Sequence, residues 1–217
     1  MPTGNGTGRW NDFPVMTIWR GKEPLILASQ SRARQSLLAN AGIAFEVVPA
    51  EIDERAVQQG SGLSAAREIA ALLAREKALS VSSKKPGRVV VGADQTLVLG
   101  NTLFSKPTGR AQAAEQLRAL AGNSHQLCSA VAVARNGKIL FSDVVSARMT
   151  MRRLNEAEID AYLDQAGAAA TVSVGAYQLE GLGVHLFERI EGDHFTILGL
   201  PLLPLLAFLR SERLLGV

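Results

Sequence analysis

Residues 88–93 read RVVVGA, and residues 94–96, which follow them, read DQT. The first run is almost continuously apolar, which is typical of a central strand that is buried on both faces of a sheet. Two shorter β-rich runs, LILA at 25–28 and AFEVV at 44–48, come earlier in the chain, and a helical pattern separates them. Strands that alternate with helices in this way predict an α/β fold.

Helical patterns recur along the whole chain, with apolar residues three or four positions apart. They cover the segment before Gly42, residues 64–80, residues 108–121, the segment after Asn155, and residues 201–210. Asn155 and Glu158 have the spacing of a capping box, which marks the start of a helix. These helices provide the layers that an apolar central strand needs on both of its faces.

Further strands are expected in the second half of the chain. Residues 127–142 alternate around Asn136–Gly137, a pair typical of a tight hairpin turn. Residues 143–151 alternate well enough to pair beside this hairpin, and residues 183–190 and 195–198 read as two short strands.

The bulk composition is that of an ordinary soluble protein. The 217 residues carry a net charge of +3, which suits an anionic small molecule and is too weak to indicate nucleic acid. The single cysteine, Cys128, excludes an internal disulfide and reads as a small core residue. No stretch reaches the roughly 18 apolar residues of a membrane-spanning helix. Residues 1–22 lack an apolar signal core and read as a loose leader, with Met16 as an alternative start to Met1, so we expect a cytoplasmic protein.

The stretch LILASQSRARQ, residues 25–35, combines the end of a strand with two serines and two arginines. A helix that starts there directs free backbone N–H groups and a positive dipole end to one place, and Arg32 and Arg34 add charge. This predicts an anion site that includes Ser29. The alternative, that Ser29 or Ser31 caps the helix while both arginines point into water, stays open from this stretch alone.

Asp94 follows the apolar strand directly, so its carboxylate emerges at the end of a buried strand. Carboxylates in such places commonly hold a metal ion or orient a water molecule. The alternative is an aspartate that forms a turn through its own backbone. The position at the end of so apolar a strand favours a functional role.

Three further charged residues are candidates on weaker signals. Lys106 precedes Pro107 and is therefore held in an extended segment, Lys77 lies one helical turn after Leu73, and Glu180 lies in an apolar, glycine-rich segment. Lys106 and Glu180 also read as ordinary surface residues, whereas Lys77 is expected near the buried face of its helix and not freely solvated.

The sequence also lacks several familiar site patterns. The three histidines show no metal-ligand spacing and read as structural, and no phosphate-binding glycine loop is present. Basic groups with a few carboxylates are suited to binding polyphosphate with a divalent cation.

Three stretches together resemble a known family. Residues 25–48, residues 89–107 and residues 176–202 are similar, in order and spacing, to the three signatures of the Maf family of nucleoside triphosphate pyrophosphatases. The resemblance covers about residues 24–210. It implies an elongated mixed β-sheet flanked by helices, as in the related inosine-triphosphate pyrophosphatases, in one domain over 23–217 with two lobes around a central cleft. It also implies a cytoplasmic homodimer that binds neither nucleic acid nor membrane.

The resemblance further implies an activity, hydrolysis of the α–β phosphate bond of a nucleoside triphosphate to give a monophosphate and pyrophosphate. Asp94 is then the proton acceptor that activates water, and a divalent cation, Mg or Mn, is held by Glu46 and Asp94. The residues implied to hold the triphosphate are Ser29, Arg34, Lys77 and Lys106.

Three positions that differ between branches of the family correspond to Ala33, Gln95 and Glu180. The family's usual S-x-S-P-R-R reads SQSRAR here, so Arg34 aligns with the second arginine and Ala33 replaces the first. Gln95 and Glu180 match the branch that acts on 7-methyl-GTP, and a carboxylate accepts two hydrogen bonds from the N1–H and 2-amino edge of guanine. The alternatives are a dTTP/UTP pyrophosphatase and a non-catalytic nucleotide-binding regulator of cell division.

Overall fold

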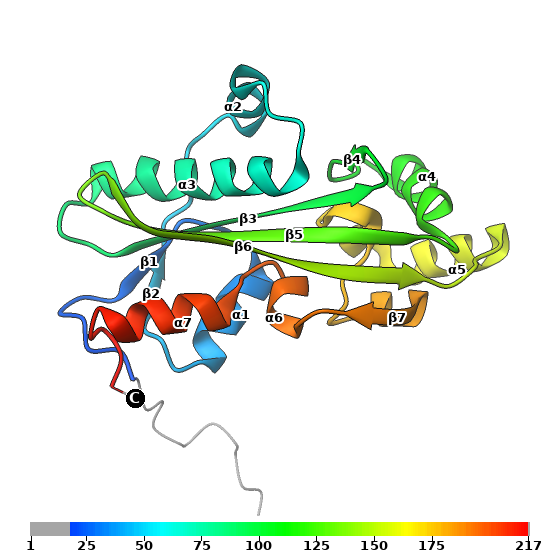
Figure 1. The fold of residues 1–217 in the computed structure, drawn as a ribbon. Coiled ribbons are helices and arrows are strands. Elements are labelled where there is room, and N and C mark those ends of the chain that lie inside the picture. The colour runs from blue at the N-terminus through cyan, green and yellow to red at the C-terminus, as the bar shows by residue number, and fades with distance from the viewer. Residues whose placement is uncertain (1–17, 217) are drawn as a thin grey trace, which may run out of the picture.

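The computed structural model of the chain describes residues 18–216, which form a mixed seven-stranded sheet. The strand order is β2-β1-β3-β5-β6-β7, and β4 pairs with β3 outside this path. Strand β1 is parallel to β2 and β3, and the other pairs are antiparallel. The strands are β1 Leu25–Leu27, β2 Phe45–Val47, β3 Val90–Leu99, β4 Thr102–Phe104, β5 Ser124–Arg135, β6 Lys138–Met151 and β7 Phe187–Glu191. The predicted α/β fold with an elongated mixed sheet is confirmed (Figure 1).

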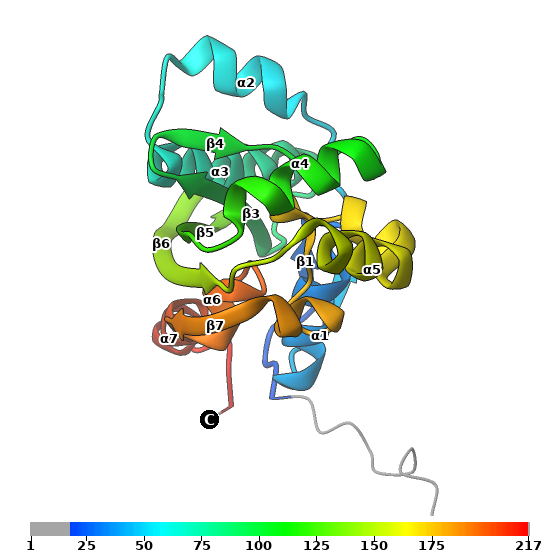
Figure 2. The ribbon, with the colours of Figure 1, turned by 90° about the vertical axis from the view of Figure 1, so that its right-hand side faces the viewer.

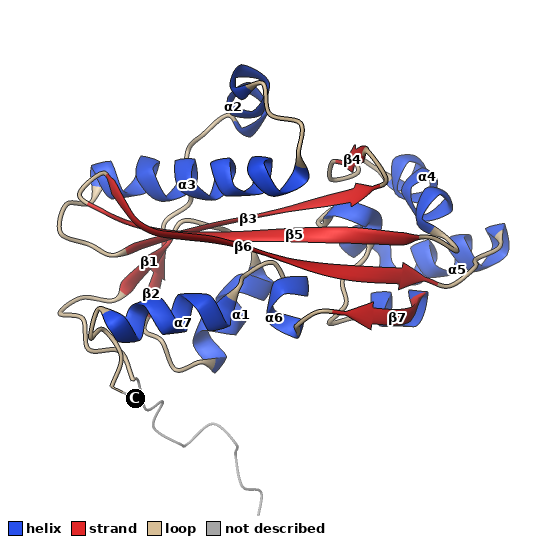
Figure 3. Ribbon diagram, in the orientation of Figure 1, coloured by secondary structure: helices blue, strands red, loops and turns tan. Residues whose placement is uncertain are grey.

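Helices cover both faces of this sheet (Figures 1 and 3). Helix α3 lies along one face, α1, α6 and α7 lie on the other, and α4 and α5 lie together at one end, which Figure 2 shows end-on. The helices are α1 Arg32–Asn40, α2 Glu54–Ser61, α3 Ala66–Lys84, α4 Arg110–Leu120, α5 Glu156–Ala166, α6 His194–Ile197 and α7 Leu202–Ser211. Three 3₁₀ segments, Gly167–Thr171, Val174–Ala176 and Leu182–Leu186, connect α5 to β7.

The predicted hairpin is the longest feature of the sheet. Strands β5 and β6 pair from Ser124↔Thr150 to Arg135↔Lys138, so residues 143–151 continue the second strand of the hairpin. Asn136 and Gly137 at its turn have φ values of 52° and 70°, the left-handed conformation that a two-residue turn of this type requires. The capping box that opens α5 is also present.

Helix α3 approaches the sheet unusually closely at Gly92 in β3. A Cβ atom there would lie 2.2 Å from the carbonyl oxygen of Ala74 and 2.6 Å from the backbone nitrogen of Ala78. Alanines on both elements line this contact, with Ala70, Ala74 and Ala78 packing against alternate alanines of β5. Glycine on the strand and small residues on the helix therefore set the short distance between α3 and β3.

Strand β3 has a gap in one of its two edges. Strand β5 pairs with the whole of one edge, from Val90 to Val98. On the other edge, β1 pairs with Val90 and Val91, and β4 pairs only from Leu97 onward. Residues 92–96 therefore have no partner strand on this edge within the described part of the chain.

Two apolar cores lie on either side of this gap. One joins β1, α1 and α7 to the first half of β3, and the other joins α4, α5 and the segment around residue 176 to its second half. The predicted division into two lobes around a cleft stays a prediction, and these two cores are the feature that supports it.

Two strand predictions near the C-terminus are wrong. Residues 195–198 were expected as a strand but belong mainly to α6, because the Asp193 carboxylate accepts from the backbone N–H of Thr196 at 2.9 Å and starts a helix. Residues 183–186 are 3₁₀ helix, and only β7 from Phe187 onward is extended.

The predicted leader, residues 1–22, overlaps the described residues only at 18–22. Ile18 donates to the carbonyl of Gly42 at 3.1 Å, and Trp19 forms a β-bridge with Leu215, so this part of the chain is attached to the domain. The rest of the predicted leader, including Met16, lies outside the described residues. Among residues 18–216, no helix has the length and apolar character needed to cross a membrane.

We predict that Gly92→Ala destabilises the protein by about 3 kcal/mol, because the added methyl group overlaps the backbone of α3. Urea denaturation measures this change. Gly60→Ala in α2 is the matched control, since a Cβ there meets no atom within 4 Å, and it should leave stability unchanged or slightly raised. Equal stability of the two variants would contradict the close contact between Gly92 and the backbone of α3.

Candidate functional site

The gap in the edge of β3 is occupied by the side chain of Arg34. The backbone N–H of Ala28, just after β1, donates to the carbonyl of Val91 at 2.8 Å. The next carbonyl along the same edge, that of Ala93, accepts instead from Nη1 of Arg34 at 2.8 Å. The guanidinium group thus replaces the missing strand at the point where β1 ends.

Arg34 has further partners that fix its orientation. Its Nη1 also donates to Ser29 Oγ at 3.0 Å, and its Nε donates to the carbonyl of Gly199 at 2.8 Å. Burial lowers the pKa of the Arg34 guanidinium from its ordinary value, while the charges of Asp94 and Glu54 raise it. Within residues 18–216 no hydrogen bond is found for Nη2, so this nitrogen remains able to donate to an anion.

Residues 25–35 have two interpretations, an anion site and a helix cap with both arginines in water, and the contacts distinguish them in part. Ser31 caps α1, because its hydroxyl accepts from the backbone N–H of Arg34 at 3.4 Å. Ser29 is buried and contacts the Arg34 side chain. Arg32 is exposed, as the solvated alternative expected, but Arg34 is not.

Asp94 lies in the same gap, on the face of β3 that is covered by α3. It is 7% exposed, and its Oδ1 lies 2.6 Å from Lys77 Nζ on α3. Asp94 is paired with Ala130 in the sheet, so it does not form a turn. Burial raises the pKa of Asp94 above the ordinary carboxyl value, and the positive charges of Lys77 and Arg34 oppose this shift without cancelling it.

Lys77 has a second carboxylate partner that the sequence did not single out. Its Nζ lies 2.8 Å from Glu54 Oε1, at the first residue of α2. Asp53 caps this helix by accepting from the N–H of Ala56 at 3.0 Å, and this fixes Glu54 at the first position of α2. The acidic run that follows β2, residues 51–54, was the available signal for this residue.

Lys106 and Glu180 lie on exposed segments that one buried glutamine joins. Nε2 of Gln116 donates to the carbonyl of Ser105 at 2.8 Å, next to Lys106. Its Oε1 accepts from the N–H of Gly175 at 3.0 Å, at the start of the segment that carries Glu180. Both charged side chains are exposed, so they are free to meet a ligand, and α4 fixes the base of each segment.

Residues 24–212, nearly all of the described domain, match the Maf-like protein family. The chain belongs to the Maf family. It is 70% identical over 202 residues, 93% of this chain and 100% of the relative, to a protein of Bradyrhizobium diazoefficiens named nucleoside triphosphate pyrophosphatase. A relative of the same name from Rhodopseudomonas palustris is 68% identical over the same shares of both chains.

A third relative carries a more specific name. A Brucella abortus protein named 7-methyl-GTP pyrophosphatase is 52% identical over 191 residues, which are 87% of this chain and 96% of the relative. All three relatives are covered over at least 96% of their length. The resemblance to the Maf family that the three stretches indicate is therefore confirmed.

Of the residues expected from the Maf resemblance, printed contacts bring together Ser29, Arg34, Lys77 and Asp94, but not Glu46. Glu46 is paired in register with Ile26, which is itself level with Val90. The backbone of Glu46 therefore lies about 10 Å from β3, because two strand spacings separate them. It is level with Val90, which comes roughly 13 Å before Asp94 along β3. Its carboxylate forms an ion pair with Arg88 at 3.1 Å. The structure does not place Glu46 beside Asp94, so a metal role for it stays a prediction.

His125 lies in the apolar core and not beside Asp94. His125 is buried, and its Nε2 lies 2.6 Å from the hydroxyl of Tyr177. Burial lowers its pKa to about 4, so the imidazole is neutral at physiological pH. Within residues 18–216, no group of three or more His, Cys, Asp and Glu side chains is arranged to hold a metal ion, and Cys128 is a buried free thiol.

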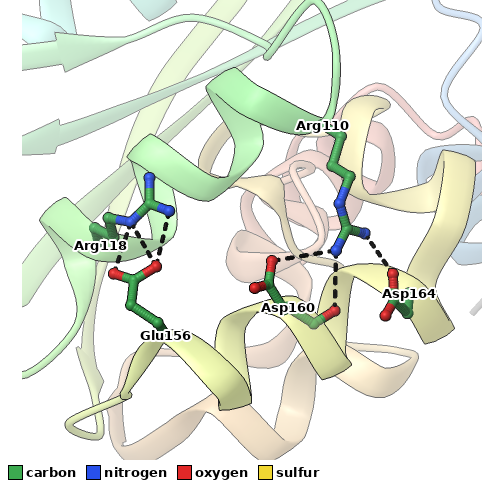
Figure 4. Close-up of polar contacts among 5 residues, drawn as sticks. All are labelled: Arg110, Arg118, Glu156, Asp160 and Asp164. Atoms are coloured by element: carbon green, nitrogen blue, oxygen red, sulfur yellow. Dashed lines mark hydrogen bonds and ion pairs between the residues drawn. The ribbon is translucent and has the colours of Figure 1, made fainter.

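Two arginines of α4 are committed to a neighbouring helix and not to the site (Figure 4). Arg110 pairs with Asp160 at 3.2 Å and Asp164 at 2.8 Å, and Arg118 pairs with Glu156 at 2.8 Å. These exposed pairs contribute little stability but orient α4 against α5. Helix α4 in turn supports the segments that carry Lys106 and Glu180.

We predict that Gln116→Leu destabilises the Maf domain by about 1–3 kcal/mol, because it leaves the buried N–H of Gly175 and the carbonyl of Ser105 without partners. Thermal unfolding with calorimetry measures the loss. Gln112→Leu, one helical turn earlier and exposed, should cost less than about 1 kcal/mol. A similar loss of stability in both variants would argue against a structural role for the two hydrogen bonds of Gln116.

Proposed function

We propose that this chain is a nucleoside triphosphate pyrophosphatase, which hydrolyses the α–β phosphate bond to release a nucleoside monophosphate and pyrophosphate. The observation that carries the proposal is the buried carboxylate of Asp94 between two fixed cations. Lys77 lies 2.6 Å away, and Arg34 is anchored on the carbonyl of the preceding residue, Ala93. The names of the relatives from Bradyrhizobium diazoefficiens and Rhodopseudomonas palustris support this function.

The proposed reaction follows from these charges. A water oxygen bonds to the α-phosphorus and gives its proton to Asp94, while the bond from the α-phosphorus to the bridging oxygen breaks. Pyrophosphate leaves with that electron pair. A carboxylate whose pKa is raised by burial is a stronger proton acceptor than an exposed one. Arg34 Nη2, Lys77 and exposed Lys106 stabilise the negative charge that develops on the phosphate oxygens.

A divalent cation, Mg or Mn, fits this site. Asp94 and Glu54 both contact Lys77 Nζ, at 2.6 and 2.8 Å, so the two carboxylates share one ammonium group and lie close to each other. Mg²⁺ is usually held by one or two protein carboxylates together with substrate phosphates and water. Asp94 and Glu54 are therefore the residues that would hold it. When bound, the cation neutralises phosphate charge and polarises the phosphoryl oxygens.

The base is proposed to be guanine, in a form such as 7-methyl-GTP. The exposed carboxylate of Glu180 accepts hydrogen bonds and donates none, which suits the N1–H and 2-amino groups of guanine. It would repel the carbonyl oxygens of uracil and thymine, which argues against dTTP or UTP. The name of the Brucella abortus relative supports the same choice. The cytoplasmic location and the homodimer stay predictions from the family resemblance.

Asp94→Asn should lower turnover by about 10²- to 10⁴-fold, since the amide cannot accept the proton from water. Pyrophosphate release is measured from 7-methyl-GTP, GTP, UTP and dTTP with magnesium or manganese. Nucleotide affinity, measured by calorimetry, should change much less than turnover. Full activity of this variant would remove Asp94 from the mechanism, and nucleotide binding without turnover by the unaltered protein would favour the regulator.

The pH dependence of turnover should report the ionisation of Asp94. Activity requires the carboxylate and falls as the pH drops through its pKa, and burial places this fall at higher pH than an ordinary carboxyl group would. Because the Lys77 charge lowers the pKa of Asp94, Lys77→Met should move the acid limb of the kcat/KM profile to still higher pH. Lys84→Met removes an exposed lysine of the same helix, paired with Glu51, and should leave the limb in place. A shift in the opposite direction would contradict the assignment.

A further inference from the structure

A small polar layer separates the two apolar cores on the face of the sheet opposite α3. Along β3, Ala93 belongs to the core of α1 and α7, and Leu97 belongs to the core of α4 and α5. Gln95 lies between them and pairs in register with Ser129 of β5, which has no exposed surface. Polar groups in such a place cost free energy unless they are hydrogen-bonded, so their partners show what the layer holds.

Both side chains of this layer hold the end of α6. Ser129 Oγ donates to the carbonyl of Thr196 at 2.6 Å. Gln95 Nε2 lies 3.2 Å from the same carbonyl and 3.0 Å from that of Ile197, and it also donates to Ser129 Oγ at 2.8 Å. Carbonyls at the end of a helix lack partners within the helix, and here the layer supplies them. The layer thereby attaches the end of α6 to β3 and β5.

The turn at the end of α6, residues 196–199, is in contact with Arg34. The N–H of Gly199 donates to the Thr196 carbonyl at 3.0 Å, and the Gly199 carbonyl accepts from Arg34 Nε at 2.8 Å. A Cβ atom on Gly199 would lie 3.3 Å from both Nε and Nη2 of Arg34, so the backbone of the turn lies against the guanidinium group. Because packed groups transmit displacements, a shift of this turn would also move Arg34.

Arg34 and Gln95 form two connections between β3 and this turn. Arg34 joins the carbonyl of Ala93 to the turn through Nη1 and Nε, and Gln95 joins β3 to the carbonyl of Ile197. The two connections leave β3 two residues apart in the sequence, with Asp94 between them, and they also reach the turn two residues apart. They therefore set the position of the guanidinium group relative to the backbone of Asp94.

The start of the turn is fixed as well. Asp193 caps α6 by accepting from the backbone N–H of Thr196 at 2.9 Å and also bonds the Thr196 hydroxyl. Thr196 is fully buried, so its carbonyl does not exchange partners with water. The polar layer thus holds a turn whose first residue is anchored and whose last residue holds Arg34.

We propose that Gln95 and Ser129 are positioning residues, which hold the turn of residues 196–199 and through it place the Arg34 guanidinium for phosphate binding. The proposal rests on the nucleotide pyrophosphatase function proposed above. The layer then acts on the phosphate chain, which all nucleoside triphosphates share, and its effect is the same for every base. A misplacement of about 1 Å in a catalytic site can cost on the order of 100-fold in rate, so this support matters for turnover.

The test uses inorganic pyrophosphate, which has phosphate groups but no base. Ser129→Ala and Gln95→Met each remove hydrogen bonds to the turn, and calorimetry should show a rise of about tenfold in the Kd for pyrophosphate. Ser82→Ala is the matched control, because Ser82 is also fully buried and its hydroxyl accepts from the Gly137 N–H at 3.0 Å, at the hairpin turn of β5 and β6. This variant should lose stability as Ser129→Ala does but keep the Kd of the unaltered protein.

A second comparison tests whether the layer acts through Arg34. Arg34→Lys keeps the charge but cannot form the bonds that the guanidinium group makes to the turn and to β3. In this background Gln95→Met should change the Kd for pyrophosphate by less than about twofold, since the two effects are coupled. A full tenfold change there would show that Gln95 acts independently of Arg34 and would overturn the proposal.

In Gln95→Met, kcat/KM should fall by the same factor for GTP and for UTP. A changed ratio of the two values would assign Gln95 to the base and overturn the proposal, as would an unchanged Kd for pyrophosphate or an equal rise in Ser82→Ala. If Ser129→Ala fails to fold, the half-buried Gln95 gives the decisive variant.

Failure of the proposed function is seen separately. An unaltered protein that binds pyrophosphate but releases none from any nucleotide would contradict the pyrophosphatase function, while the Kd values of the variants still test the layer. An unaltered protein that does not bind pyrophosphate would overturn the role of the layer in phosphate binding.

Discussion

The guanidinium group of Arg34 joins three segments that are far apart in the sequence. It extends from α1 to the carbonyl of Ala93 on β3 and to the carbonyl of Gly199 after α6, with Ser29 beside it. These are the segments that carry the three Maf signatures. No one of these segments forms the candidate site alone, because Arg34, Asp94 and the carbonyl of Gly199 come from different segments. A half-buried arginine with two backbone acceptors thus ties these segments together and keeps Nη2 as a donor for an anion.

On the face of β3 that α3 covers, the candidate site depends on the short distance between α3 and β3. Gly92 allows α3 to approach, and this brings Lys77 within 2.6 Å of Asp94. Successive residues of one strand thus have different roles. Asp94 faces α3 and the proposed chemistry, whereas Gln95 faces α6 and the polar layer, because successive side chains of a strand point to opposite faces.

Much of this arrangement could be predicted from the sequence because its signals are local. The apolar run before Asp94, the Asn136–Gly137 turn and the Asn155 capping box each determine structure within a few residues, and all three are found. Residues 195–198 were misread because their apolar pattern suggests a strand, whereas the neighbouring Asp193 side chain starts a helix. The separation of Glu46 from Asp94, and the ion pair of Glu54 with Lys77, have no signal in the sequence, because they depend on the register of β1 with β2 and on where α2 lies against α3.

The interrupted edge of β3 has a consequence for assembly. An unpaired strand edge is a template on which another chain can add a strand, and such additions lead to aggregation. Here β1 and β4 close both ends of the interruption, and Arg34 already occupies the carbonyl of Ala93 between them. An extended polypeptide would have to displace these two strands and the Arg34 side chain. The gap in the edge of β3 is thereby protected against strand addition.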